Sequence, residues 1–119
     1  MSIVQLGRAV TAMRQELTTA ANALGRDMPD IGDRMMTAVQ LNRAGNLLGT
    51  QLPLHVPRAT LPAAEARALL VQRLDDASAR LLQGRPIGDA AVHARAAADM
   101  LGEIANGLSS AQRMLQVRV

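Results

Sequence analysis

One stretch decides the fold that this sequence predicts: residues 89–117, which read DAAVHARAAADMLGEIANGLSSAQRMLQV. Its small or apolar residues recur at alternating steps of three and four, the spacing of one face of an α-helix. They are Ala90, Ala94, Ala97, Leu101, Ile104, Leu108, Ala111 and Leu115. Alanines line the start of this face and larger aliphatic residues line the rest, so we expect a neighbouring helix to approach most closely near the start.

The N-terminal residues predict another strong helix, over residues 2–24. Ser2 and Gln5 have the S-x-x-Q form of a capping box, in which each side chain accepts a hydrogen bond from the other residue's backbone N–H. Seven apolar positions follow at a heptad spacing suited to a bundle: Ile3, Leu6, Val10, Met13, Leu17, Ala20 and Leu24. Gly25 is placed to end this helix as its C-cap.

Two further helices are predicted, over residues 31–48 and 61–83. Asp30 or Asp33 can cap the start of the first, whose apolar stripe reads Ile31, Met35, Ala38, Leu41, Gly45 and Leu48. Thr60 is the expected cap of the second, and Pro62 lies in its first turn, where a missing N–H costs little. The stripe of this helix reads Ala63, Ala66, Leu70, Leu74, Ala77 and Leu81.

Residues 49–60 separate these two helices and contain Pro53 and Pro57. Proline inside a helix removes a hydrogen bond and collides with the preceding turn, so a regular helix is not expected here. Leu52, Leu54 and Val56 alternate, which predicts an extended strap with its apolar side chains against the bundle. We therefore expect an all-α chain of one domain, a four-helix bundle made of two antiparallel helical hairpins joined by this Pro-containing strap.

The residue types that are missing exclude several kinds of chemistry. The chain has no Cys, so it forms no disulfide, thiolate nucleophile or thiolate metal site. Every basic residue is Arg, which excludes a side-chain Schiff base. Together with abundant Ala, Gly and Leu, this indicates the codon bias of a GC-rich bacterial genome. With no signal peptide and no apolar span, we expect a cytoplasmic protein, and export by a signal-less route stays open.

The two histidines do not predict a catalytic or metal site. His93 lies one helical turn after Asp89, but no further His, Cys or Glu at ligand spacing completes a set of three or four. His55 lies between two prolines and has no partner in the sequence. The adjacent carboxylates Asp75 and Asp76 point apart on a helix. We therefore expect no catalytic residue, no metal ligand and no cofactor, and a protein that is not an enzyme.

Nucleic-acid binding is an alternative function. Arginines recur at six- or seven-residue spacing and could form rows that contact phosphates: Arg8, Arg14, Arg67, Arg73 and Arg80. However, the net charge is only +3, acidic residues are interleaved with these arginines, and no aromatic residue is present to stack on bases. An Arg-mediated, nucleic-acid-associated regulator is therefore the alternative rather than the first choice.

The methionines give the best indication of function. Seven Met are many for a chain of this length, and Met28, Met35 and Met36 cluster around the first turn and the second helix. Flexible, polarisable Met side chains suit both an irregular core and an adaptable binding surface. The candidate partner-binding residues are Met35, Met36, Val39, Leu69, Leu70 and Leu82.

The resulting hypothesis is a non-catalytic bacterial protein–protein interaction module: an adaptor, co-chaperone or assembly subunit that presents a Met/Leu-rich helical face. The partner is another protein or a second copy of the chain, because the wide apolar faces of the second and third helices also predict a homo-oligomer. A structural subunit of a filament or secretion apparatus is a further alternative.

Overall fold

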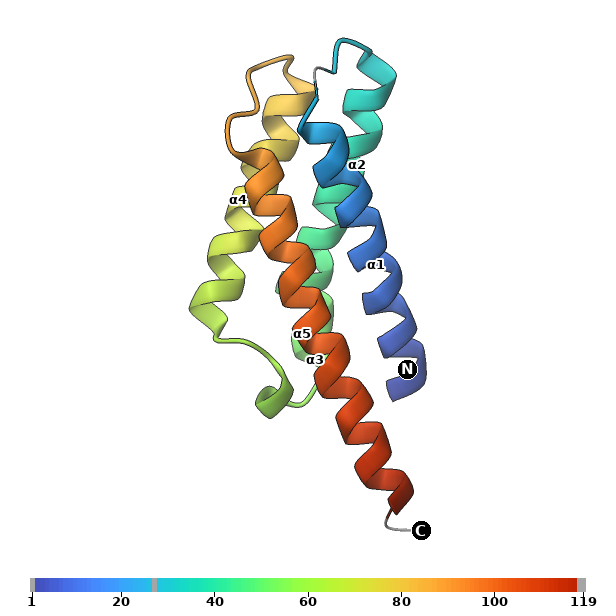
Figure 1. Cartoon of the computed structure of the whole chain (residues 1–119). Helices are drawn as coiled ribbons and strands as arrows, with labels where there is room; N and C mark the ends of the chain where they lie inside the picture. The colour runs from blue at the N-terminus through green and yellow to red at the C-terminus, as the bar shows by residue number, and fades with distance from the viewer. Residues whose placement is uncertain (1, 27, 118–119) are drawn as a thin grey trace.

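The computed structural model describes residues 2–26 and 28–117, with side chains as far as Met114. The described residues form helices and turns only, which confirms the all-α prediction. Their four long helices are α1 (Ile3–Leu24), α2 (Ile31–Asn46), α4 (Ala64–Leu82) and α5 (Ala90–Val117). Consecutive long helices run antiparallel and form a rod of 54 × 24 × 20 Å (Figure 1).

Packing between the two hairpins is more extensive than packing within them. Helix α1 lies mainly against α5, and α2 lies mainly against α4, whereas fewer residues of α1 approach α2 and fewer residues of α4 approach α5. The predicted bundle of two antiparallel hairpins is thus confirmed, with the first and last helices as its closest pair. Helix α5 continues past the start of α1, so its last turns project from the lower end of the rod (Figure 1).

The core is aliphatic and follows the predicted stripes most closely in α1 and α5. In α1 every stripe residue is buried except Ile3, which is half-buried, and in α5 the stripe is buried from Ala90 to Leu108. Leu115 lies outside the described side chains. Leucines from all four long helices meet in this core, including Leu17, Leu41, Leu74, Leu81 and Leu101. Each stabilises the fold by roughly 1.5–3 kcal/mol through burial.

The helix starts are confirmed for α1 and α2 and wrong for α4. Ser2 and Gln5 form the capping box, with both hydrogen bonds at 3.1 Å, and Asp30 accepts from the Gly32 N–H at 2.8 Å. Thr60 does not cap α4, which begins at Ala64 after Ala63. The reason is that the Thr60 hydroxyl donates to the Pro57 carbonyl at 2.7 Å, within the short 3₁₀ turn η2 (Arg58–Thr60).

The strap is the main correction to the predicted fold, because residues 49–55 are helical rather than extended. Helix α2 runs on through a π-helical turn, η1 (Leu47–Gln51), into the single turn α3 (Leu52–His55). Only the residues around Pro57 are extended. Accordingly Leu52 and Val56, four residues apart, are buried, while Leu54 is exposed, so the alternating pattern does not predict this segment.

Pro53 explains why the continued helix is π-helical. In an α-helix its ring would collide with the carbonyl of Gly49, and that carbonyl would lose its N–H partner. The wider turn avoids this, because the Leu52 N–H donates to the Leu47 carbonyl five residues back. Arg67 of α4 then donates to the Leu48 carbonyl at 3.3 Å and holds the turn against α4.

Polar side chains also join α2 to α4 further along the pair. The Arg34 guanidinium donates to four backbone carbonyls, those of Met28, Arg80, Leu81 and Arg85, at 2.9–3.4 Å. The carbonyls of Arg80 and Leu81 also accept the backbone N–H groups of Arg85 and Gly84, so Arg34 adds to the hydrogen bonds at the end of α4 and joins this end to α2. The buried Ser78 hydroxyl donates to the Ala38 carbonyl at 3.0 Å.

Candidate interaction surfaces

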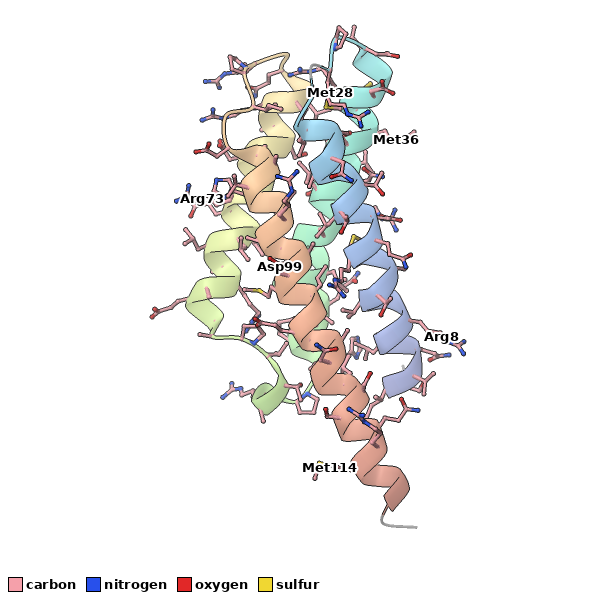
Figure 2. All side chains as sticks on the ribbon, in the orientation of Figure 1. Arg8, Met28, Met36, Arg73, Asp99 and Met114 are labelled. Carbon is pink, nitrogen blue, oxygen red and sulfur yellow. The ribbon has the colours of Figure 1, made fainter. Side chains whose placement is uncertain are left out.

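The first half of α2 carries a line of exposed apolar side chains. Ile31, Met35 and Val39 recur every four residues and are 73%, 53% and 55% exposed, and Met36 beside them is also exposed. We call these four residues the α2 face. Figure 2 shows Met36 on the outer side of the bundle near its upper end. The sequence interpretation placed Ile31 and Met35 in the core stripe, which is wrong, because Arg34 makes the contacts to α4 in this turn.

Leu82 is exposed at the same end of the bundle as the α2 face. Arg34, between Ile31 and Met35, donates to the carbonyl of Leu81, so the last turn of α4 lies beside the first turns of α2. Leu82 follows that contact directly and is exposed. Met35, Met36 and Leu82 are therefore exposed near one end of the α2–α4 pair, and Val39 is exposed one turn further along α2.

Leu69 and Leu70 do not belong to this group. They lie 12–13 residues before Leu82 on α4, which corresponds to roughly 18–20 Å along the helix. Leu69 is exposed, whereas Leu70 is only half-buried and continues the core stripe of α4 toward Leu74. The structure thus separates these two candidates from the other four.

The histidines and acids do not gather into a catalytic or metal-binding constellation in the described residues. His93 and Asp89 line one small hollow of about 190 Å³ between α4 and α5, where the Asp76 carboxylate is paired with Arg80 at 3.1 Å. Across the residues that the structure describes, no group of three or more His, Cys, Asp or Glu side chains is placed to hold a metal ion. His55 is exposed at the end of α3, far along the chain from these acids.

The five arginines proposed for phosphate contacts do not form one row. Arg67 donates to backbone carbonyls of Leu48 and Pro62, and Arg80 is paired with Asp76. Arg14 lies over Gly102 of α5, where a Cβ atom would come within 3.1 Å of its guanidinium carbon. Arg8 extends outward from α1, and Arg73 lies across the bundle on α4 (Figure 2).

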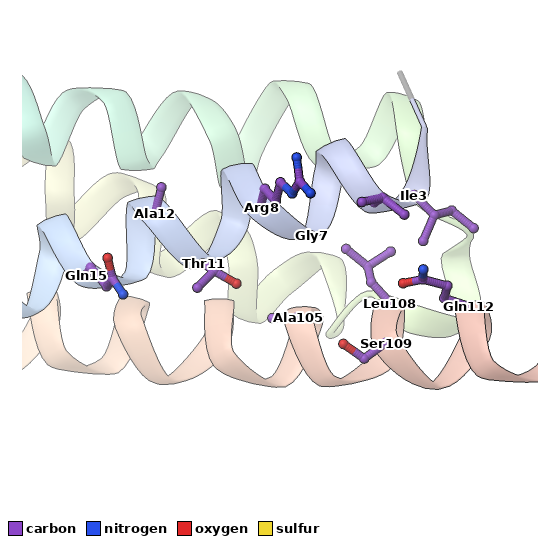
Figure 3. A pocket seen from close by; sticks show the side chains of 11 residues that line it. Ile3, Gly7, Arg8, Thr11, Ala12, Gln15, Ala105, Leu108, Ser109 and Gln112 are labelled. Atoms are coloured by element: carbon purple, nitrogen blue, oxygen red, sulfur yellow. The ribbon is translucent and has the colours of Figure 1, made fainter.

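A groove between α1 and α5, which the sequence interpretation missed, has a volume of about 410 Å³. Its floor is formed by Ile3, Gly7, Ala105 and Leu108, and its margins by longer or polar side chains: Val4, Arg8, Thr11, Gln15, Ser109 and Gln112. Figure 3 shows these side chains along both helices. Among the described residues that line the groove, none is acidic.

Gly7 is the residue that could have indicated this groove. It lies beside the buried stripe of α1, and a Cβ atom there would meet nothing within 4 Å. Its missing side chain therefore widens the space between the two helices. Glycine is tolerated at many kinds of position in a helical sequence, so this signal becomes specific only in the structure.

Comparisons with known proteins identify no relative, so a function can be argued only from the fold and from these surfaces. No protein-family model, no curated protein and no solved structure matches this chain. None of the helices in the described part of the chain has the length and hydrophobicity that a bilayer crossing requires.

Proposed function

We propose that the protein is a non-catalytic interaction module that binds a helix of another protein through the α2 face. The observation that carries this proposal is the line Ile31, Met35 and Val39, three large aliphatic side chains that are each more than half exposed on consecutive turns. A folded protein gains nothing in stability by arranging exposed apolar residues in a line, and such groups typically mark interaction sites.

The spacing of these residues favours a helical partner. Residues at steps of four form a ridge on a helix surface, and the ridge of one helix packs into the groove of another at a crossing angle near −50°. Ile31, Met35 and Val39 form such a ridge over about 12 Å. A single ridge matches the width of one helix better than that of a broad, flat protein surface.

Two features of the α2 face suit an adaptable apolar contact. Its four members carry no charge, so burying them leaves no charged group without a partner. Met35 and Met36 are unbranched and polarisable, so they can follow the shape of different partner side chains.

The bundle is built so that these residues are not needed in the core. In the first turns of α2, Arg34 and not Ile31 or Met35 joins α2 to α4. Substitution on the α2 face should therefore affect binding and leave folding intact. This separation allows a direct test of the proposal.

The test is site-specific photo-crosslinking in cells of the source organism. We expect p-benzoylphenylalanine at Met35 or Val39 to crosslink to one segment of a different protein, with apolar residues at steps of three and four in that segment. The same amino acid at Thr19, which is exposed on α1, is the control and should not crosslink to that segment. Crosslinks from Met35 and Val39 to a second copy of this chain alone, or to no protein, would overturn the proposal.

A matched pair of double variants provides the second arm. Met35→Asp with Val39→Asp places two charges on the α2 face, and Thr18→Asp with Asn22→Asp places two charges one turn apart on the exposed side of α1. Only the first pair should abolish recovery of the crosslinked partner, with unchanged far-UV circular dichroism for both. Equal loss, or equal retention, in the two pairs would contradict a specific α2 site.

A further inference from the structure

A second surface with different chemistry lies on the opposite pair of helices. We infer that the groove between α1 and α5 binds an amphipathic helix with an acidic outer face, in another protein. This site is separate from the α2 face in both residues and charge, so the inference does not depend on the proposed function. It would make the protein an adaptor with two unlike binding surfaces.

The charge of the groove's surroundings is the first observation. Arg8 lines the groove, Arg14 lies at one end over Gly102, and Arg113 lies one turn beyond Ser109 at the other end. Within the part of the chain that the structure describes, these three arginines make no ion pair. The nearby Glu16 carboxylate is paired instead with Arg43 of α2 at 3.4 Å. The lining of the groove therefore holds an arginine and no carboxylate, which favours an acidic partner.

The shape of the groove is the second observation. On α1 it runs from Val4 to Gln15, about three helical turns or 16 Å, and on α5 it follows Ala105, Ser109 and Gln112. Its long axis is thus parallel to two antiparallel helices. A third helix can lie along such a groove, with its apolar side chains inside and its polar face outward.

Gly7 gives the groove its depth. A Cβ atom at this position would contact nothing within 4 Å, so the space is open to a side chain from outside. Around it Ile3, Ala105 and Leu108 form an apolar floor. A guest leucine or methionine that enters beside Gly7 would bury apolar area while its flanking carboxylates face Arg8 and Arg113.

Other acidic ligands fit these observations less well. A nucleic acid would expose bases to a floor that has no aromatic residue for stacking, because the chain contains none. A bilayer surface is flat on this scale, whereas the apolar residues here lie inside a concave groove between polar margins. An amphipathic helix satisfies both the apolar floor and the positive margins.

The experiment is a fluorescence titration with a designed peptide of about 18 residues, which gives five helical turns. The peptide carries Leu and Ala on one face, Glu on the other, and one Trp at the margin of the apolar face. The protein has no Trp or Tyr, so peptide emission is free of protein background. Two comparison peptides have the same apolar face with Lys in place of Glu, or the acidic composition in scrambled order. We expect saturable binding of the acidic peptide only, weakening with added salt.

Three variants connect this binding to the groove. Gly7→Leu places a side chain in the open space, where its Cβ meets nothing within 4 Å, and should reduce affinity at least about tenfold, whereas the smaller Gly7→Ala should reduce it much less. Arg8→Glu combined with Arg113→Glu should also reduce it about tenfold or more. Arg73→Glu, a single charge reversal on the exposed side of α4, is the control for the position of the charge and should leave the affinity unchanged.

The outcomes separate this inference from its alternatives. Binding of the acidic peptide that Gly7→Leu or the double arginine reversal leaves intact would overturn it, as would equal binding of the Lys peptide or no binding at all. Stronger association with vesicles rich in phosphatidylserine, or with an oligonucleotide, than with the acidic peptide would also overturn it. Met35→Asp should not change this titration, so the α2 face and the groove are tested separately.

Discussion

The α1–α5 pair and the α2–α4 pair are stabilised in different ways. In the described residues no side-chain hydrogen bond joins α1 to α5, which meet through buried aliphatic residues such as Leu17, Leu101 and Ile104. Helices α2 and α4 share a smaller apolar contact and add side chains that donate to backbone carbonyls across the pair, from Arg34, Ser78 and Arg67.

This difference explains which residues are left exposed. The stripe of α1 is used almost completely for packing, so α1 and α5 expose mainly polar or small residues and leave a groove between them. Polar contacts replace part of the packing in α2 and α4, so Ile31, Met35 and Val39 remain at the surface. A helix pair stabilised partly by hydrogen bonds can thus present apolar residues to a partner without losing its own contact.

The largest predicted effect concerns the aliphatic pair. Leu101→Ala removes a fully buried side chain between α1 and α5 and should lower the free energy of unfolding by about 3 kcal/mol. Denaturant unfolding followed by far-UV circular dichroism measures this change. Met114→Ala, on the exposed end of α5, is the control and should have almost no effect. A small effect of Leu101→Ala would contradict packing as the main source of stability here.

The second prediction concerns the polar contacts of α2 and α4. Arg34→Ala removes the hydrogen bonds from the guanidinium to the carbonyls of Arg80, Leu81 and Arg85 and should cost about 2 kcal/mol. Arg43→Ala removes one ion pair, with the partly exposed Glu16, so it should cost less, up to about 1 kcal/mol. Hydrogen exchange should localise the loss in Arg34→Ala to the last turn of α4. Equal costs for the two variants would show that the Arg34 contacts stabilise the fold no more than the ion pair between Arg43 and Glu16 does.

Two glycines sharpen the comparison, because replacing each by alanine should change the stability in opposite directions in the two helix pairs. Gly7→Ala meets nothing within 4 Å and should stabilise α1 by up to about 1 kcal/mol. Gly49→Ala places a Cβ 3.2 Å from Val71 of α4 and should destabilise by about 1 kcal/mol. Thermal unfolding of both variants measures the signs. Val71→Ala should partly restore Gly49→Ala, and a failure to do so would show that the contact with Val71 is not the cause.

The smallest predicted effect belongs to the α2 face. Met35 is more than half exposed, so Met35→Asp should change the free energy of unfolding by no more than about 0.5 kcal/mol. Met13→Asp, on the buried stripe of α1, should instead unfold the protein. Denaturant unfolding compares the two directly. A large loss for Met35→Asp would mean that the α2 face contributes to the fold and is not a free binding surface.

The sequence predicts the aliphatic pair far better than the polar one. Regular steps of three and four identify nearly all buried residues of α1 and α5, because burial there depends on apolar spacing alone. In α2 the same method places Ile31 and Met35 in the core. It fails because an arginine, Arg34, faces α4 in that turn, and the carbonyls that bind it become neighbours only in the folded chain.

The strap and the groove lay outside sequence reasoning for a similar reason. Two prolines led to the prediction of an extended strap over residues 49–60, but they do not reveal that a π-helical turn accommodates Pro53 and keeps residues 49–55 helical. The turn depends on Arg67 and Val71 of another helix. Likewise the groove arises from Gly7 on α1 and Ala105 on α5, which are far apart in the chain. Contacts of this kind leave no periodic signal.

The most direct test of the central claim is the mass of the protein in solution, measured by light scattering over a wide range of concentration. Refractive-index detection is needed because the chain has no Trp or Tyr. If the α2 face is reserved for a different protein, the mass stays at that of one 12.6 kDa chain at every concentration. A stable dimer that Met35→Asp converts to a monomer would contradict the claim, because the α2 face would then be occupied by a second copy of the chain.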